Sequence, residues 1–506
     1  MRGIKKLHHL IQALSKTEKR YISIELSKQR SKKGEIDLQL FDLLKKQNTI
    51  DEDKIKSIPD FNSTLKLIIR SKYLFEFILR CLIDYYHSRE IEIAIGNHIR
   101  IIKIFILKGL HEYTHHHLNN AQKLAEKFED LYRLGILCSL RKVIVTRSSG
   151  SHSEFFKEML KIEQQENSVH ERIINLNSYN NYLNHISVAL KKNSGSRLDA
   201  DTQEILNSTA SSPLFINEKN ALTKKARIIF HEVNAIYNER MMRDYKKALE
   251  HTEKQMELIE SLEAYDRSNP PSYITCLKHC CIFAAETRQF AKAKEALQRL
   301  KILYKDKSTS KNIFEKSFIF LSILEAETRL TLIEHPVNRP ENSHGKILEE
   351  IELFDKMFDG ESRMIIYFNI TLRLILTNDY KGAFRWLEKI LHEHQGMRQD
   401  ILQDAHILSL LCIYEIDSVN LFQSRERSYL RHYQLHPASE KGEEKSKPAN
   451  TKIIHLLAKV YQHKNNAEQV RKSLEELQSF VAEEIKSNEI DHLLGETMLA
   501  WIRKKI

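Results

Sequence analysis

Glycine and proline are scarce in this chain, whose 506 residues include 13 glycines and 8 prolines. In a helix interior glycine costs about 1 kcal/mol and proline about 3 kcal/mol, so a chain nearly free of both can stay helical almost throughout. The motifs G-x-x-x-x-G-K-[ST], G-x-G-x-x-G and G-x-S-x-G are all missing, which argues against a phosphate-binding loop or a serine-nucleophile turn. We therefore expect an all-α protein.

Long apolar runs are also missing. The most apolar stretch, residues 99–107, carries Arg100 and Lys103, so no segment reaches the roughly 20 apolar residues that a membrane-spanning helix needs. The N-terminal segment is interrupted by His8 and His9 and lacks the unbroken apolar core of a secretory signal. Six cysteines without a pairing framework are typical of a reducing compartment. The sequence thus predicts a cytoplasmic protein with no membrane insertion.

Positive charge is concentrated at the N-terminus. Residues 1–33 hold ten Lys or Arg against two Glu, a net +8 out of +11 for the whole chain. A basic segment of this kind steers toward nucleic acid or an acidic surface, although a solvated helix face that aids solubility has the same composition. The candidate contact residues are Lys16, Lys19, Arg20, Lys28, Arg30, Lys32 and Lys33.

Helix signals begin early in the chain. Ser15 and Glu18 fit a capping box, in which the serine side chain and the glutamate side chain each satisfy one backbone amide at the start of a helix. Further apolar periodicity follows, and we interpret residues 1–95 as a basic N-terminal helical unit.

An aromatic residue followed three positions later by alanine recurs further along. The copies are Asp244–Ala248, Gln289–Ala293 and Asp379–Ala383, with a weaker one at Leu118–Ala121. The aromatic residues at 245 and 290 are 45 positions apart, and the next, at 380, follows after 90, or two such steps. We expect each copy to open the second helix of a helical pair. The aromatic residue would fill the wedge toward the next pair and the alanine would let the two axes approach.

These units resemble tetratricopeptide-like repeats. Four segments in the first part of the chain also resemble a bacterial family of large, uncharacterised helical-repeat proteins: SKTEKRY (15–21), LFDLL (40–44), FEFILRCL (75–82) and KGLHEYTHHHLNNAQKLAEK (108–127). The resemblance implies a right-handed α–α superhelix, a tetratricopeptide-like solenoid, behind an N-terminal helical head. It implies no activity and no functional residues.

The organisation that follows has four parts. They are the N-terminal unit 1–95, the repeats 96–435 with a polar insertion near 191–213, a flexible loop 436–450 and C-terminal capping helices 451–506. We expect the insertion to hold little more than one helical turn. The loop is rich in Pro, Lys and Glu and has no apolar anchor.

One short motif suggests chemistry. His111, Glu112 and His115 match H-E-x-x-H, in which two imidazoles one turn apart hold zinc and the glutamate activates water. Leu118 and Ala121 stand where a metzincin has a glycine and a third histidine. The repeat frame also places the motif at a helix end and the following turn rather than within a helix. Zinc hydrolase is therefore a remote alternative, and we predict no catalytic residues, metal or cofactor.

The first helices of repeat pairs carry polar stripes. In arrays of the resembled kind these helices line the concave surface, where Asn and Arg hold a peptide. The candidate partner-binding residues are Arg227, His231, Asn234, Asn238, Asn181 and Asn184, and ordinary solvated helix positions would have the same pattern. The leading hypothesis is a non-enzymatic scaffold that binds a protein or peptide in its concave groove. The alternative is a nucleic-acid-associated regulator that uses its basic N-terminus.

Overall fold

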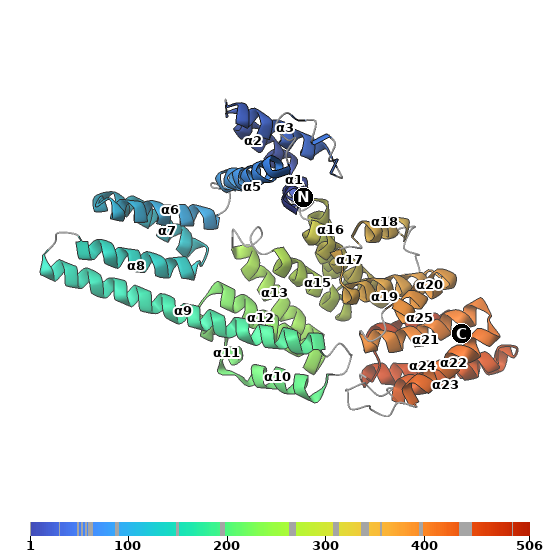
Figure 1. Cartoon of the computed structure of the whole chain (residues 1–506). Coiled ribbons are helices and arrows are strands. Elements are labelled where there is room, and N and C mark those ends of the chain that lie inside the picture. Colours follow the sequence, from blue (N-terminus) through green and yellow to red (C-terminus); the bar gives the residue numbers. More distant parts are fainter. Residues whose placement is uncertain are drawn as a thin grey trace. The chain divides into compact units, whose positions relative to one another are not determined.

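The computed structural model of the chain is built from helices in every part that it describes (Figure 1). It describes residues 2–29, 31–47, 50–51, 54–55, 58, 64–86, 91–147, 151–192, 198–262, 270–306, 313–334, 344–354, 357–393, 398–434, 448–487 and 489–506. No strand occurs in these ranges, so the predicted all-α class is confirmed there. The predicted loop lies almost entirely outside the described residues, and residues 448–450 already belong to a helix.

The chain divides into two compact units, residues 1–174 and residues 175–506. The first unit includes the predicted N-terminal helical unit together with the helices up to residue 174. The helices of its first part are α1 (Arg2–Ala13), α2 (Lys16–Ser27), α3 (Lys32–Lys46) and α5 (Thr64–Tyr86). They share one buried core, to which Leu7, Ile22 and Phe41 contribute side chains with no exposed surface.

The capping box predicted for α2 is confirmed. The Glu18 amide donates to Ser15 Oγ over 3.3 Å, and the Ser15 amide donates to Glu18 Oε2 over 2.5 Å. The Tyr86 hydroxyl also donates to Glu18, which ties the start of α2 to the end of α5. The Glu18 carboxylate thus takes part both in the local helix cap and in a contact between α2 and α5.

The remaining helices of the first unit pack in chain order. They are α6 (Ile91–Leu107), the short 3-10 helix η1 (His111–Tyr113), α7 (Thr114–Lys127), α8 (Leu131–Arg147) and the long α9 (His152–Lys192), which continues into the second unit. Helix α7 packs against both α6 and α8. Leu118 is the fifth residue of α7 rather than its opening residue, because the helix already begins at Thr114.

The second unit contains the helices in which the three clearest aromatic-x-x-Ala copies lie. After α9 come α10 (Ala200–Ser211), α11 (Pro213–Ile216), η2 (Glu218–Asn220), α12 (Lys224–Tyr237), the π-helical turn η3 (Asn238–Met242), α13 (Tyr245–Ser261), α15 (Pro270–Glu286), α16 (Phe290–Lys305) and α17 (Ile313–Glu334). They are followed by α18 (His344–Phe354), α19 (Gly360–Leu376), α20 (Tyr380–Glu393), α21 (Gln399–Ile416), α22 (Val419–Gln434), α23 (Pro448–Gln462), α24 (Ala467–Lys486) and α25 (His492–Arg503).

The described part of the polar insertion, residues 198–213, is more helical than expected. Its composition predicts little more than a turn, yet α10 is a helix of 12 residues that begins with the Asp199 side chain accepting from the Thr202 amide. Leu198 and Leu206 are buried in a cluster with Tyr179 of α9. Two apolar anchors and one cap are sufficient to fold the segment, because tertiary packing supplies most helix stability.

The predicted openings of the second helices are confirmed. Helices α13, α16 and α20 begin at Tyr245, Phe290 and Tyr380, and each packs against the helix before it. The alanines three positions later, Ala248, Ala293 and Ala383, have no exposed surface. The aromatic rings themselves are only half-buried, at the edges of the two large cores of this unit.

Several helices end in a left-handed turn that is formed without glycine. Glu129, Arg243, Arg288, Asn378 and Asp417 all have left-handed backbone angles, with φ between 49° and 64°. In four of the turns the next amide reaches back five residues: Asp130 to Ala125 O (2.8 Å), Gln289 to Ala284 O (2.7 Å), Asp379 to Leu374 O (2.9 Å) and Ser418 to Ile413 O (3.4 Å). This is the Schellman geometry, which satisfies orphan carbonyls at a helix end.

Replacing Arg288 by glycine should raise the free energy of unfolding by about 0.5–1 kcal/mol. A side chain in the left-handed region costs about 1–2 kcal/mol, and the larger unfolded-state entropy of glycine cancels part of that gain. Arg288→Ala is the control, because it removes the same exposed charge and keeps Cβ. Urea unfolding monitored by circular dichroism compares the two, and equal stability of both variants would contradict the argument.

Candidate interaction surface

The polar stripe predicted on α12 is mostly used inside the fold. The Asn234 side-chain amide donates to Phe230 O over 2.9 Å, and that of Asn238 donates to Asn234 O over 2.8 Å. Asn238 is buried and Asn234 is half-buried. Arg227 Nε donates to Ala221 O over 3.4 Å. The two asparagines therefore bond within the part of α12 that leads into η3, and Arg227 contacts the segment that precedes α12.

His231 is buried as well, with 1% of its surface exposed. Its Nδ1 lies 3.0 Å from Nδ1 of His251 on α13, so one ring donates and the other accepts. Its Nε2 lies 3.5 Å from Glu218 Oε2. Burial lowers the pKa of both rings. The pKa of His251 falls to about 4, because the charge of His231 adds to the effect of burial. The pair is a structural contact between two helices.

This pair predicts a pH dependence of stability. Unfolded histidines bind protons near the ordinary pKa of 6.5, whereas His251 in the folded protein does so near 4. The unfolded state therefore binds more protons in this window, and the free energy of unfolding should fall as pH drops from about 6.5 toward 4. Denaturant unfolding at several pH values measures the slope. His251→Asn should reduce it and His455→Asn, at an exposed position on α23, should not.

The other predicted asparagines are at the surface. Asn181 and Asn184 are exposed on α9, and neither forms a hydrogen bond with any described residue. No side-chain hydrogen bond joins them to the stripe on α12 within the described ranges, and binding of a partner by these six residues stays a prediction.

The basic residues of the N-terminal segment have different surroundings. Lys16 and Arg20 are exposed and lie one turn apart on α2. Lys28 is exposed and pairs with Glu25 over 2.6 Å, while Lys19 is half-buried, and burial lowers its pKa. Arg30 lies outside the described residues, as do the side chains of Lys32 and Lys33.

The H-E-x-x-H residues lie directly after a turn. The repeat frame had predicted that the motif lies at the end of one helix and in the following turn. In the structure, His111 and Glu112 belong to η1 and His115 to the start of α7, so the motif lies at the beginning of a helix. Glu112 and His115 are exposed. Among the residues that the structure describes, no three His, Cys, Asp or Glu side chains are grouped to hold a metal ion. Metal analysis of the purified protein tests the zinc alternative.

A charged surface that the sequence did not indicate runs along α15 and α17. Lys278 pairs with Glu325 over 2.9 Å. Two turns further along α15, Glu286 pairs with Arg329 of α17 and lies 3.7 Å from His492 of α25. We call Glu239, Lys278, His279 and Glu325 the inner-face cluster. Its members are half-buried, and burial raises the pKa of Glu239 even though nearby cations, Lys278 among them, act against this shift.

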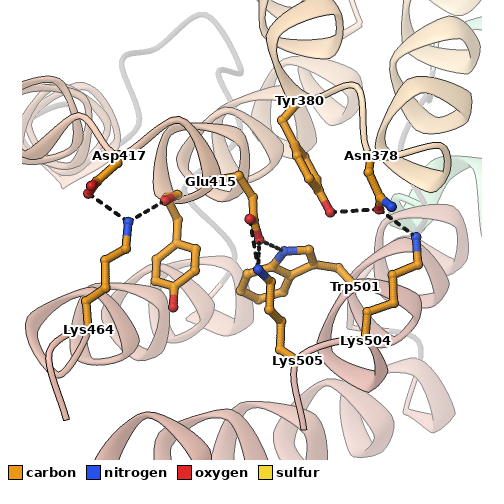
Figure 2. Close-up of polar contacts among 9 residues, drawn as sticks. Asn378, Tyr380, Glu415, Asp417, Lys464, Trp501, Lys504 and Lys505 are labelled. Carbon is orange, nitrogen blue, oxygen red and sulfur yellow. Dashed lines mark hydrogen bonds and ion pairs between the residues drawn. The ribbon is translucent and has the colours of Figure 1, made fainter. Parts of the chain in front are cut away.

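The C-terminal helix α25 packs on the same side of these helices. It contacts α17 and α19, and its apolar residues Leu494, Met498 and Ile502 have no exposed surface. Trp501 is also buried, packs edge-on against Tyr414 and donates its indole N–H to Glu415 Oε1 over 2.6 Å (Figure 2). The array of helix pairs thus already holds one amphipathic helix of its own chain.

Lysines hold the ends of two helices near this contact (Figure 2). Lys504 Nζ donates to Leu376 O (2.9 Å) and Asn378 Oδ1 (3.0 Å) at the end of α19. Lys464 Nζ donates to Tyr414 O (2.9 Å) near the end of α21. Ammonium groups are favourable at helix C-termini, where carbonyl groups lack partners and the helix dipole is negative.

Together, the fold and this surface define an all-α protein made of stacked helix pairs. None of the described helices is long and apolar enough to cross a membrane. A comparison with models of protein families, with curated proteins and with solved structures gives no match to this chain. The resemblance to a bacterial helical-repeat family therefore stays a prediction from the sequence.

Proposed function

We propose that this protein is a non-enzymatic interaction scaffold, a tetratricopeptide-like right-handed array of helix pairs that binds a protein or peptide. The observation that carries the proposal is the packing of α25 on α17 and α19. This packing means that α17 and α19 present a surface to which an amphipathic helix can bind. Recognition of a helix in a groove uses the same combination of apolar anchors and polar contacts.

The inner-face cluster is the part of this surface on which a partner would lie. His279 is seven residues before Glu286 on α15, which places both on one side of the helix. At the Glu286 end the surface is in contact with α25 through His492. At the other end, the paired side chains of Lys278 and Glu325 are each about one-fifth exposed. A partner that reaches these groups would add charge contacts to a partly dehydrated surface.

Site-specific photo-crosslinking in the producing cells tests this proposal. A benzoylphenylalanine residue is placed at His279 in the inner-face cluster, and the matched control is placed at Glu295, exposed on α16. A discrete adduct from position 279 and none from position 295 supports the scaffold, and mass spectrometry identifies the partner. Absence of adducts at 279, or equal adducts at both positions, would contradict it.

A second candidate function is binding of nucleic acid by the N-terminal segment. It is favoured by the net charge of +8 over residues 1–33 and by the exposed pair Lys16 and Arg20 on α2. Phosphate contacts would make the affinity for duplex DNA or RNA fall steeply with salt. A shift assay at two salt concentrations compares Lys16→Gln/Arg20→Gln with Lys157→Gln/Lys161→Gln, which has the same spacing on α9. Equal binding by both variants would contradict this function.

A further inference from the structure

A small cavity lies between α7, α8 and α9 in the first unit. Its volume is about 170 Å³, and its lining includes Arg141 and Cys138 of α8, Glu126 of α7 and Val169 of α9. Pockets for drug-sized ligands measure about 300–1,000 Å³, so a ligand of this cavity has to be smaller than a typical drug molecule. All of these residues belong to the same compact unit.

One part of the lining is apolar. Leu134, Leu137 and Val169 are buried, with at most 8% of their surface exposed, and they present aliphatic groups to the cavity. An aliphatic side chain placed against them would lose contact with water, which contributes roughly 0.8 kcal/mol for each buried methylene group. This part of the cavity therefore fits a short branched hydrocarbon chain.

The polar part of the lining has an unused cation. Arg141 is half-buried and forms no hydrogen bond or ion pair with any residue that the structure describes. Its neighbours are paired: Arg172 lies 3.9 Å from Glu129, and Lys142 pairs with Glu166. A guanidinium group is suited to two parallel hydrogen bonds with a carboxylate. Arg141 is thus the group in this cavity that is available to bind one.

A carboxylate also lines the cavity. Glu126 accepts one hydrogen bond, from the Gln122 side chain over 2.8 Å, and is otherwise exposed. An ammonium group is a natural partner for it, because a carboxylate has about four acceptor positions. The cavity therefore combines a cation, an anion and an aliphatic wall.

We infer that this cavity binds a free α-amino acid with a branched aliphatic side chain. Arg141 binds the carboxylate of the ligand, Glu126 binds its ammonium group, and Leu134, Leu137 and Val169 contact its side chain. This site is independent of the proposed scaffold function, because it involves none of the helices that form the inner-face cluster.

The chain contains its own reporter for this site. Cys138 lines the cavity and is half-buried, whereas the other five cysteines are buried. Burial raises the pKa of the Cys138 thiol, so its alkylation is slow and its rate is easily measured at mildly alkaline pH. A ligand in the cavity should cover the thiol and slow the reaction further.

The experiment measures the rate of Cys138 alkylation by a maleimide in the full-length protein, with mass spectrometry to confirm the labelled residue. L-leucine should slow this reaction in a saturable manner. 4-Methylpentanoate, which is leucine without the ammonium group, and isoamylamine, which is leucine without the carboxylate, should protect at least about tenfold less well at equal concentration, because each loses one charge-assisted contact.

Two variants complete the test. Arg141→Gln should raise the half-protecting concentration of L-leucine about tenfold or more. Arg147→Gln, an exposed position in the last turn of the same helix, should leave it unchanged. Circular dichroism confirms that both variants are folded. The inference is overturned if L-leucine gives no protection of the wild-type protein, if 4-methylpentanoate or isoamylamine protects equally well, or if Arg141→Gln is protected as the wild type is.

Discussion

Replacing Trp501 by alanine should lower the free energy of unfolding of the second unit by about 3–5 kcal/mol, the usual cost of removing a large buried aromatic side chain. Trp501 has 2% of its surface exposed and packs on Tyr414 with ring centroids 5.6 Å apart. Its indole N–H also donates to Glu415, which forms an ion pair with Lys505 over 2.8 Å. Loss of the ring would leave a cavity and remove a hydrogen bond from a carboxylate with 13% exposure.

The conservative variant Trp501→Phe separates these two effects. It keeps most of the apolar surface and loses the hydrogen bond, so we expect a loss of about 1–2 kcal/mol. Trp386, the other of the two tryptophans in the chain, lies in the same unit and reports denaturant unfolding by fluorescence in both variants. If Trp501→Ala were as stable as Trp501→Phe, helix α25 would not be docked as the structure has it.

Replacing Arg329 by methionine should cost about 3–5 kcal/mol of stability, because it leaves one partner of a buried ion pair without the other. The side chain of Arg329 is 13% exposed and that of Glu286 is 6% exposed. The nearby His492 cannot replace the guanidinium at neutral pH, since burial lowers the pKa of this histidine to about 4. Denaturant unfolding followed by fluorescence measures the loss.

Two further variants show that burial is the cause. The double variant Glu286→Leu/Arg329→Met should recover most of the lost stability, because apolar groups often replace a buried pair without loss. Lys294→Met removes one partner of an exposed pair with Glu334 and should cost less than about 1 kcal/mol; the side chain of Lys294 is 57% exposed. Equal losses for Lys294→Met and Arg329→Met would contradict the argument.

Local signals predicted the starts of helices well. Ser15 and Glu18 form the capping box, and Tyr245, Phe290 and Tyr380 open their helices, because a cap or an aromatic-x-x-Ala unit acts within one turn of backbone. The same reasoning missed α10, whose stability comes from Leu206 packing against residues outside its own segment.

The surroundings of the candidate binding residues could not be predicted from the sequence. A stripe with helical spacing on α12 gave His231 and Asn238 as groove residues, yet both are buried. Periodicity shows which residues share a face of a helix and does not show what covers that face. The H-E-x-x-H motif likewise shows spacing in the sequence, while the break between η1 and α7 is visible only in the structure.

The sequence by itself determined the helical class and the starts of α13, α16 and α20, because scarce glycine and proline and short-range signals act through local backbone preferences. Tertiary structure alone decided that α25 packs on α17 and α19, that Glu286 meets Arg329, and that Arg141 lines a cavity without an ion-pair partner among the described residues. These contacts join residues far apart in the chain, and burial and pairing at such distances depend on how whole helices pack.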